Sequence, residues 1–241
     1  MPKLGLSTGL TRSGLTTPGI VTDSLVLKHN YTAGNVIPIS DGAAYFDGSN
    51  DYINCGTGIN LGTADFTIAG WIKQPEATNN LAIISKFEDN DNRWYIRSDA
   101  SDKLHFYVLV GGSQIITLVS TNTLPEDTWV HIAITANRSG NVQKAYINGV
   151  LDKTNTNTDN STDFDIDADL NIGAYGTTNF FGGNVCNMAI WSAVLTQPEI
   201  KSVMNKNYAG LTSSEKTSLQ SWWNLSADAN DSHGSNNGTL S

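Results

Sequence analysis

Apolar and polar residues alternate along most of this chain, and this period of two restricts its fold more than any other feature. In the run 66–73 the even positions are Phe, Ile, Gly and Ile and the odd positions are Thr, Ala, Trp and Lys. Side chains on a β-strand point alternately to opposite faces, so this pattern is typical of a strand and not of a helix. Residues 129–135 repeat it. Such runs, separated by clusters of Gly, Asn, Asp and Pro, predict an all-β, antiparallel, two-sheet β-sandwich.

The other elements expected from the sequence are mostly short strands. They span 43–47, 51–55, 81–86, 93–98, 103–110, 114–119, 142–148, 166–172 and 183–191. Asn148-Gly149 predicts a hairpin turn, because both residues tolerate a positive φ. Helix signals occur only near the end of the chain. Thr196, followed by Pro198 and Glu199, predicts a short helix, and Ser213 or Ser214 could begin a second one.

Length and composition favour one domain with a terminal extension. The 241 residues suit a single large sandwich. Residues 1–22 are rich in Gly, Ser, Thr and Pro and are read as an extended N-terminal arm, with a disordered tail as the alternative. The sandwich then spans 23–241, with its core in 43–195 and with helices and an edge strand in 196–241. Cys55 and Cys186 are read as two buried free thiols, with a disulfide between them as the alternative.

The charge of the chain bears on its partners. Lys and Arg number 14 against 23 Asp and Glu, which gives a formal net charge of −9. A negative protein repels phosphate backbones and anionic lipids, so nucleic acid and membrane surfaces are not expected partners. No window contains the roughly 18 continuous apolar residues that predict a membrane span, and the first thirty residues lack a secretion signal.

A series of sequence landmarks resembles a known superfamily. The run Ala43–Ile53 is followed in order by 66–72, 83–86, 124–133, 146–150, 170–173 and 190–196. Together they resemble the concanavalin A-like lectin/glucanase superfamily, in its laminin G-like form. The resemblance implies a jelly roll of two packed sheets, binding of glycans or proteins, and often a calcium ion. Residues 223–240 resemble a segment that precedes the first landmark in many members, so they are expected to add an edge strand, either within the chain or on a neighbouring copy.

The beginning of the chain bears on its biological setting. Residues 17–44 are similar in style to structural proteins of tailed bacteriophages. With the predicted arm, this favours a virion-surface protein, either a capsid decoration, a head fibre or a tail-associated adhesin. Its arm would contact other virion proteins, its sandwich would contact cell-surface glycans, and it would be oligomeric on the particle. The alternative is a free, extracellular bacterial lectin.

Catalysis is not expected. Glucanases of this superfamily carry a Glu-x-Asp-x-(x)-Glu strand, because glycoside cleavage needs two closely spaced carboxylates. That motif is absent, and the five Glu residues do not form such a pair. No zinc-like His spacing or nucleophile motif occurs either.

Two acidic segments each have two interpretations, one of which is a calcium site. Asp165 and Asp167 lie in an acidic run, 163–169, which is either a solvated outer face or part of a calcium site. Asp231 lies in an Asn- and Gly-rich cluster, 230–237, which is either a loop of Asx turns or a second source of calcium ligands.

Two turn-rich segments combine aromatic and polar residues, as glycan binding requires. A sugar stacks its C–H face on an aromatic ring while its hydroxyl groups are recognised by polar groups. The predicted ligand-binding residues are Asp91, Arg93 and Trp94 in the first segment and Tyr175, Asn179 and Phe180 in the second. Large aromatic residues next to strands are often buried, so a core role for Trp94 is the alternative.

Overall fold

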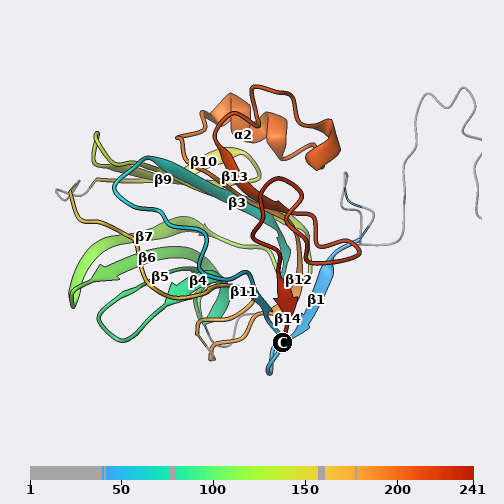
Figure 1. Ribbon diagram of the computed structural model, residues 1–241, viewed down its shortest axis with the longest axis horizontal. Coiled ribbons are helices and arrows are strands. Elements are labelled where there is room, and N and C mark those ends of the chain that lie inside the picture. Colours follow the sequence, from blue (N-terminus) through green and yellow to red (C-terminus); the bar gives the residue numbers. More distant parts are fainter. Residues whose placement is uncertain (1–39, 41, 76–79, 157–160, 177) are drawn as a thin grey trace, which may run out of the picture. The chain divides into compact units, whose positions relative to one another are not determined.

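The computed structural model describes residues 40, 42–75, 80–156, 161–176 and 178–241. Its strands form two antiparallel sheets that lie one over the other (Figure 1). They belong to a compact unit of residues 39–241. The predicted all-β sandwich is therefore confirmed, whereas the arm predicted at 1–22 lies outside the described residues.

Within the described ranges, each sheet has seven strands. Sheet A contains, in spatial order, β1 (Ala44–Asp47), β12 (Gly182–Trp191), β3 (Phe66–Lys73), β8 (Val130–Asn137), β9 (Val142–Ile147) and β10 (Val150–Thr156), with β13 (Leu219–Trp223) also paired to β12. Sheet B contains β14 (Thr239–Leu240), β2 (Ile53–Asn54), β11 (Leu170–Ile172), β4 (Leu81–Phe87), β5 (Arg93–Ser98), β6 (Lys103–Val110) and β7 (Ser113–Thr123). The hairpin turn predicted between β9 and β10 is present, with positive φ angles at Asn148 and Gly149.

The main core lies between the two sheets. Phe66 of β3 and Phe106 of β6 meet edge to face, with ring centroids 5.9 Å apart, and so connect sheet A to sheet B. Trp94 and Trp223 are fully buried in the same cluster. Burial of an apolar side chain of this size contributes about 1.5–3 kcal/mol, so this layer supplies most of the driving force for folding.

A second, smaller core covers the outer face of sheet A. It is formed where helix α2 (Gln197–Val203) and the 3-10 helix η1 (Tyr208–Gly210) pack on that sheet, on the side opposite to sheet B (Figure 1). Helix α2 begins as predicted, because Thr196 and Glu199 form a capping box. The sheet offers three alanines, Ala69, Ala133 and Ala189, and their small side chains let the covering layer approach closely.

Two expected elements differ from the structure. The second helix expected at Ser213 or Ser214 is wrong, because residues 213–218 form turns. The carbonyl groups of Glu215 and Ser218 accept hydrogen bonds from Trp191 and Ser192, which brings the chain directly into β13. The strand expected at 166–172 begins only at Leu170.

The end of the chain and the two cysteines settle alternatives that the sequence left open. Strand β14 pairs with β2 of the same chain, with Thr239 opposite Asn54 and Leu240 opposite Ile53. The C-terminal edge strand is thus supplied within the chain. Cys55 and Cys186 are both buried free thiols.

Candidate functional site

The outer face of sheet B carries a group of aromatic rings. On β5 the apolar residues Trp94 and Ile96 point into the core, so the alternation of the strand places Tyr95 on the outside. Strand β6 repeats this arrangement, with Tyr107 directly opposite Tyr95 in the register. The two tyrosine rings are stacked, with centroids 5.2 Å apart and an interplanar angle of 13°. Because the rings stack face to face, each covers one face of the other, and Tyr95 is only 8% exposed whereas Tyr107 is half-buried. The accessible aromatic surface of the pair is therefore mainly that of Tyr107.

A third tyrosine extends this surface across β4. Tyr175, from the segment that follows β11, meets Tyr95 edge to face at 5.3 Å and contacts Phe87 of β4 at 4.8 Å. Burial raises the pKa values of Tyr95 and Tyr175, so both stay protonated at neutral pH. We call this surface the aromatic face. It consists of Phe87, Arg93, Tyr95, Arg97, His105, Tyr107 and Tyr175.

Two arginines flank the rings. The Arg97 guanidinium lies 4.7 Å from the centre of the Tyr95 ring, and the Arg93 guanidinium lies 5.9 Å from that of Tyr107. Among the described residues, the Nε–H group of each arginine is buried without a hydrogen-bond partner. The one salt bridge found in this part of the chain joins Lys206 to Glu215, so neither arginine is paired with a carboxylate there. The aromatic face therefore has positive charge and unused donors.

His105 lies beside these arginines and is neutral at physiological pH. Burial and the positive charge of Arg97 lower the pKa of His105 to about 4. Its Nδ1 atom lies 3.2 Å from Nη2 of Arg97, and its Nε2 atom lies 3.2 Å from the Thr117 hydroxyl. Because arginine can only donate, Nδ1 accepts the hydrogen bond and Nε2 carries the proton. The histidine thus orients Arg97 without adding a charge.

The structure places the six residues that were predicted to bind a ligand in different parts of the molecule. Arg93 and Tyr175 belong to the aromatic face. Trp94 does not, because its indole is fully buried in the main core. Asp91 is exposed in the loop between β4 and β5, where its carbonyl group accepts a hydrogen bond from Gly112.

The last two predicted residues lie in the segment that connects β11 to β12. Asn179 is exposed, with a positive φ of 47°, and its carbonyl group pairs with Ala82. Phe180 is half-buried and packs against Tyr52, which precedes β2, with centroids 6.3 Å apart. The sequence reasoning missed Tyr95, Arg97, His105 and Tyr107. The signal that could have found them was their shared outward parity on two paired strands.

A lysine lies close to the acidic run that contains Asp165 and Asp167. No group of three His, Cys, Asp or Glu side chains that could hold a metal ion is found among the residues that the structure describes. The Lys86 ammonium instead lies among oxygen atoms near the acidic run, 2.7 Å from Asn60 Oδ1 and 3.2 Å from the carbonyl groups of Thr57 and Ile166. Burial lowers the pKa of Lys86, and the nearby aspartates oppose that shift. A protein cation therefore lies beside these carboxylates.

Asp231 has a structural role in the C-terminal loop. Its Oδ1 atom accepts from the backbone N–H groups of Trp222, His233 and Gly234, each at 3.0 Å, and its Oδ2 atom accepts from the Ser221 hydroxyl and Asn236 N–H. Burial alone would raise the pKa of Asp231, but the hydrogen bonds from these N–H groups outweigh burial and lower it. Its lone pairs are thus used within the protein. Calcium stays a prediction of the family resemblance.

Comparisons with solved structures agree on the fold. A protein of Bacteroides ovatus matches with a TM-score of 0.60 and 20% identity over 82% of this chain, which spans 57% of the length of that protein. Domain 4 of the arabinanase AbnA of Geobacillus stearothermophilus, solved with arabinotriose, gives 0.55 and 18% over 66% of this chain and 75% of that one. The carbohydrate-binding module CBM40 of a Ruminococcus gnavus sialidase gives 0.54 and 16% over 68% and 99%. At these identities the likeness shows the fold alone.

The sequence itself identifies the family. No curated protein matches it. In the described part of the chain, no helix has the length and apolar character needed to cross a membrane. The family model described as the concanavalin A-like lectin/glucanases superfamily matches residues 47–201, which is more than half of the chain. The chain therefore belongs to the concanavalin A-like lectin/glucanases superfamily, in its laminin G-type branch.

Proposed function

We propose that this protein is a non-catalytic lectin-like module that binds a carboxylate-bearing glycan on the aromatic face of sheet B. The observation that carries the proposal is the stacked pair Tyr95 and Tyr107, flanked by Arg93 and Arg97, whose Nε–H groups have no partner among the described residues. Aromatic rings stack against the C–H face of a sugar, and arginine recognises a carboxylate with two parallel hydrogen bonds.

The charge pattern favours an acidic ligand. The chain is negative overall, whereas the aromatic face contains two arginines and no Asp or Glu. His105 orients Arg97 and stays neutral, so the guanidinium groups supply the positive charge. A carboxylated sugar would be attracted by this charge, and a protein carboxylate would not compete with it.

Two relatives were solved with glycans, one of them neutral and one of them carboxylated. The arabinanase domain was solved with arabinotriose, and the sialidase module was also solved bound to α2,3-sialyllactose. Both are different proteins with low identity to this chain, so their ligands serve as probes here and not as assignments. Catalysis is not part of the proposal, because the aromatic face lacks the carboxylate pair that glycoside cleavage needs.

Placement of this module on a virion is a separate prediction. It depends on the predicted arm, residues 1–22, which lies outside the described residues. Neither the family nor the three relatives link the chain to a virion. The glycan-binding proposal does not depend on it, and it fits a free extracellular lectin equally well.

The test is a glycan array followed by calorimetry on the full chain. We expect signals among carboxylated glycans, and we expect α2,3-sialyllactose to bind about ten-fold more tightly than lactose, which equals about 1.4 kcal/mol. Arg97→Gln should remove this preference, whereas Lys153→Gln, which deletes an exposed positive charge on β10 of sheet A, should keep it. An array without signals, equal binding of the two sugars, or an unchanged preference in Arg97→Gln would overturn the proposal.

A further inference from the structure

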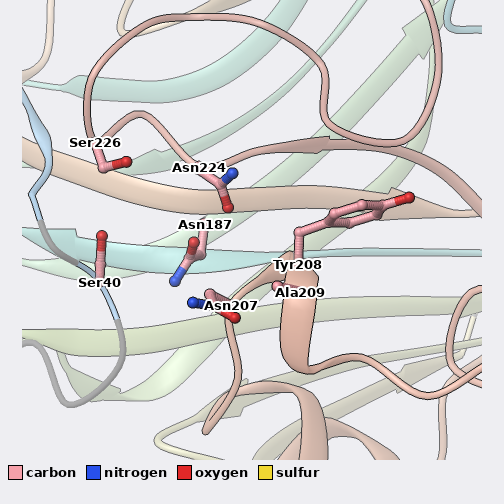
Figure 2. A pocket seen from close by; sticks show the side chains of 7 residues that line it. All are labelled: Ser40, Asn187, Asn207, Tyr208, Ala209, Asn224 and Ser226. Atoms are coloured by element: carbon pink, nitrogen blue, oxygen red, sulfur yellow. The ribbon is translucent and has the colours of Figure 1, made fainter.

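A polar pocket of about 230 Å³ lies on the outer side of sheet A, away from the aromatic face. Figure 2 shows its lining side chains, which come from β12, from η1 and the residue before it, from the segment after β13, and from the start of the described chain. They are Ser40, Asn187, Asn207, Tyr208, Ala209, Asn224 and Ser226. They include no Asp, Glu, Lys, Arg or His, so a ligand of this pocket would be recognised by hydrogen bonds.

Asn187 lies at the centre of this pocket and has unused hydrogen-bonding capacity. Only 4% of the residue is exposed, yet neither its Oδ1 nor its Nδ2 atom has a hydrogen-bond partner among the described residues. Figure 2 shows its carboxamide pointing into the space between Ser40, Asn207 and Asn224. Leaving a buried polar group unpaired costs roughly 1–3 kcal/mol. A native protein seldom tolerates that cost unless a water or a ligand supplies the missing partner.

A β-bulge gives Asn187 this position. The pairing of β12 with β3 shifts register between Cys186 and Ala189, and Asn187 adopts a positive φ of 48°. The neighbouring strand accommodates the bulge at Gly70, where an added Cβ would come within 2.7 Å of the Met188 side chain. Bulges often re-aim a side chain towards a functional site. Here the bulge places the polar side chain of Asn187 in the pocket on the outer side of sheet A.

The surrounding side chains are already held in place. Asn224 accepts a hydrogen bond from Trp222 Nε1 and donates one to the Ser232 hydroxyl, both at 2.8 Å. Asn207 Oδ1 accepts from the N–H of Gly210 at 3.1 Å. The walls are thus pre-organised by internal contacts, and Asn187 is the group with both a donor and an acceptor to offer.

We propose that this pocket binds a neutral ring compound through two adjacent hydroxyl groups. The Asn187 carboxamide presents an acceptor next to a donor, so one hydroxyl would donate to Oδ1 and its neighbour would accept from Nδ2. The volume is below the roughly 300–1,000 Å³ of pockets for drug-sized ligands, which limits the occupant to a single ring. Such a diol occurs in a sugar residue and in a free cyclic polyol. The inference is independent of the proposed function, because the two sites lie on different sheets.

The test is a titration of the ¹⁵N-labelled full chain followed by NMR. The probes are cis-1,2-cyclohexanediol and, as a control with one hydroxyl, cyclohexanol. We expect the Asn187 side-chain amide signals and the backbone signals of Asn207 and Ser226 to shift and saturate with the diol and not with cyclohexanol. Equal responses to both probes, or no response to the diol, would overturn the proposal by leaving water as the partner of Asn187.

Two variants separate this site from the aromatic face. Asn187→Gly removes the carboxamide and tolerates the positive φ, so the chain should fold while its dissociation constant for the diol rises about ten-fold or more. Tyr107→Ala should leave the diol response unchanged. Unaltered diol binding in Asn187→Gly would refute the assignment. Methyl β-galactopyranoside and myo-inositol then distinguish a sugar residue from a free polyol, because the true ligand class should bind more tightly than the other.

Discussion

The outer faces of the two sheets follow the same alternation but differ in use. Sheet A presents Ala69, Ala133 and Ala189, and the segment that contains α2 and η1 packs on them to form a second core. Sheet B presents Tyr95, Tyr107 and two arginines, whose Nε–H groups are buried without a hydrogen-bond partner among the described residues. Small side chains allow another segment of the chain to pack closely on the sheet. Large amphipathic side chains instead provide apolar and polar groups that suit ligand binding. The comparison predicts that substitutions on sheet A change stability, while substitutions on sheet B change binding.

The largest effect is expected in the second core. Trp191 is 1% exposed, meets Trp222 edge to face at 6.0 Å and donates its Nε1–H to the Glu215 carbonyl. Trp191→Ala should lower the free energy of unfolding by about 3–5 kcal/mol, because it leaves a cavity under the covering layer. Urea denaturation measures this. A loss below about 1 kcal/mol would mean that the covering layer contributes little to stability.

Acid should affect the two faces unequally. His131 of β8 is fully buried under the covering layer, and burial lowers its pKa from 6.5 to about 3. Between these two pH values the unfolded chain binds a proton that the folded chain does not, so stability falls as the pH falls. Between pH 7 and pH 4 the loss from this group should be on the order of 3 kcal/mol.

Variants of the two histidines test this difference. His131→Gln should reduce the loss of stability between pH 7 and pH 4, as measured by urea midpoints at each pH. His105→Gln should reduce it by nearly the same amount down to pH 4, and the two variants should differ only below pH 4, because the pKa of His105 is about 4 and that of His131 is about 3. Equal effects of the two variants at pH 3 would contradict the assignment of the two faces.

On sheet B, removal of one ring should weaken binding with little effect on folding. Tyr107→Ala deletes half of the stacked pair, and aromatic contacts of this kind contribute about 0.5–1.5 kcal/mol, so affinity for the bound glycan should fall about two- to ten-fold. Its unfolding free energy should change by no more than about 2 kcal/mol. Tyr45, which is 70% exposed on β1, provides the matched control, and Tyr45→Ala should bind normally. Equal losses in both variants would count against the aromatic face.

The smallest effect is expected from removal of calcium. The described residues gather no metal-binding group, and Asp231 uses its lone pairs for internal hydrogen bonds. The thermal midpoint measured with and without EDTA should therefore differ by no more than about 1 °C. A drop of several degrees would favour the calcium ion that the family resemblance implies.

Much of the fold could be predicted from the sequence, because alternation is a local property. Strands β3, β5 and β6 have the expected bounds. The main exception, the strand expected from 166, fails for a physical reason. Phe164 and Ile166 are buried, but they belong to an irregular segment. Side chains there alternate between buried and exposed positions although the segment forms no strand.

The candidate site was predicted only in part. Arg93 and Tyr175 were selected because they lie in turn-rich segments, and the structure brings both to the aromatic face. Tyr95 and Tyr107 were missed because strand residues were assigned to packing, although their parity opposes that of the buried Trp94 and Phe106. The pairing of Tyr95 with Tyr107 depends on the register between two strands, which alternation alone does not specify.

The pocket around Asn187 was beyond prediction from the sequence. It depends on a bulge that interrupts β12 and on residues far along the chain, such as Asn207 and Asn224. Nothing in the local pattern of 183–191 indicates the extra residue, which lies where the partner on one edge of β12 changes from β1 to β13.

The most direct test of the central claim is a crystal structure of the chain with α2,3-sialyllactose. The account predicts a sugar ring packed against Tyr107 of the stacked pair, with the carboxylate bound by Arg97 or Arg93. Sugar bound instead at the loops that carry Asp91 or Asn179, with the tyrosine rings uncovered, would contradict it.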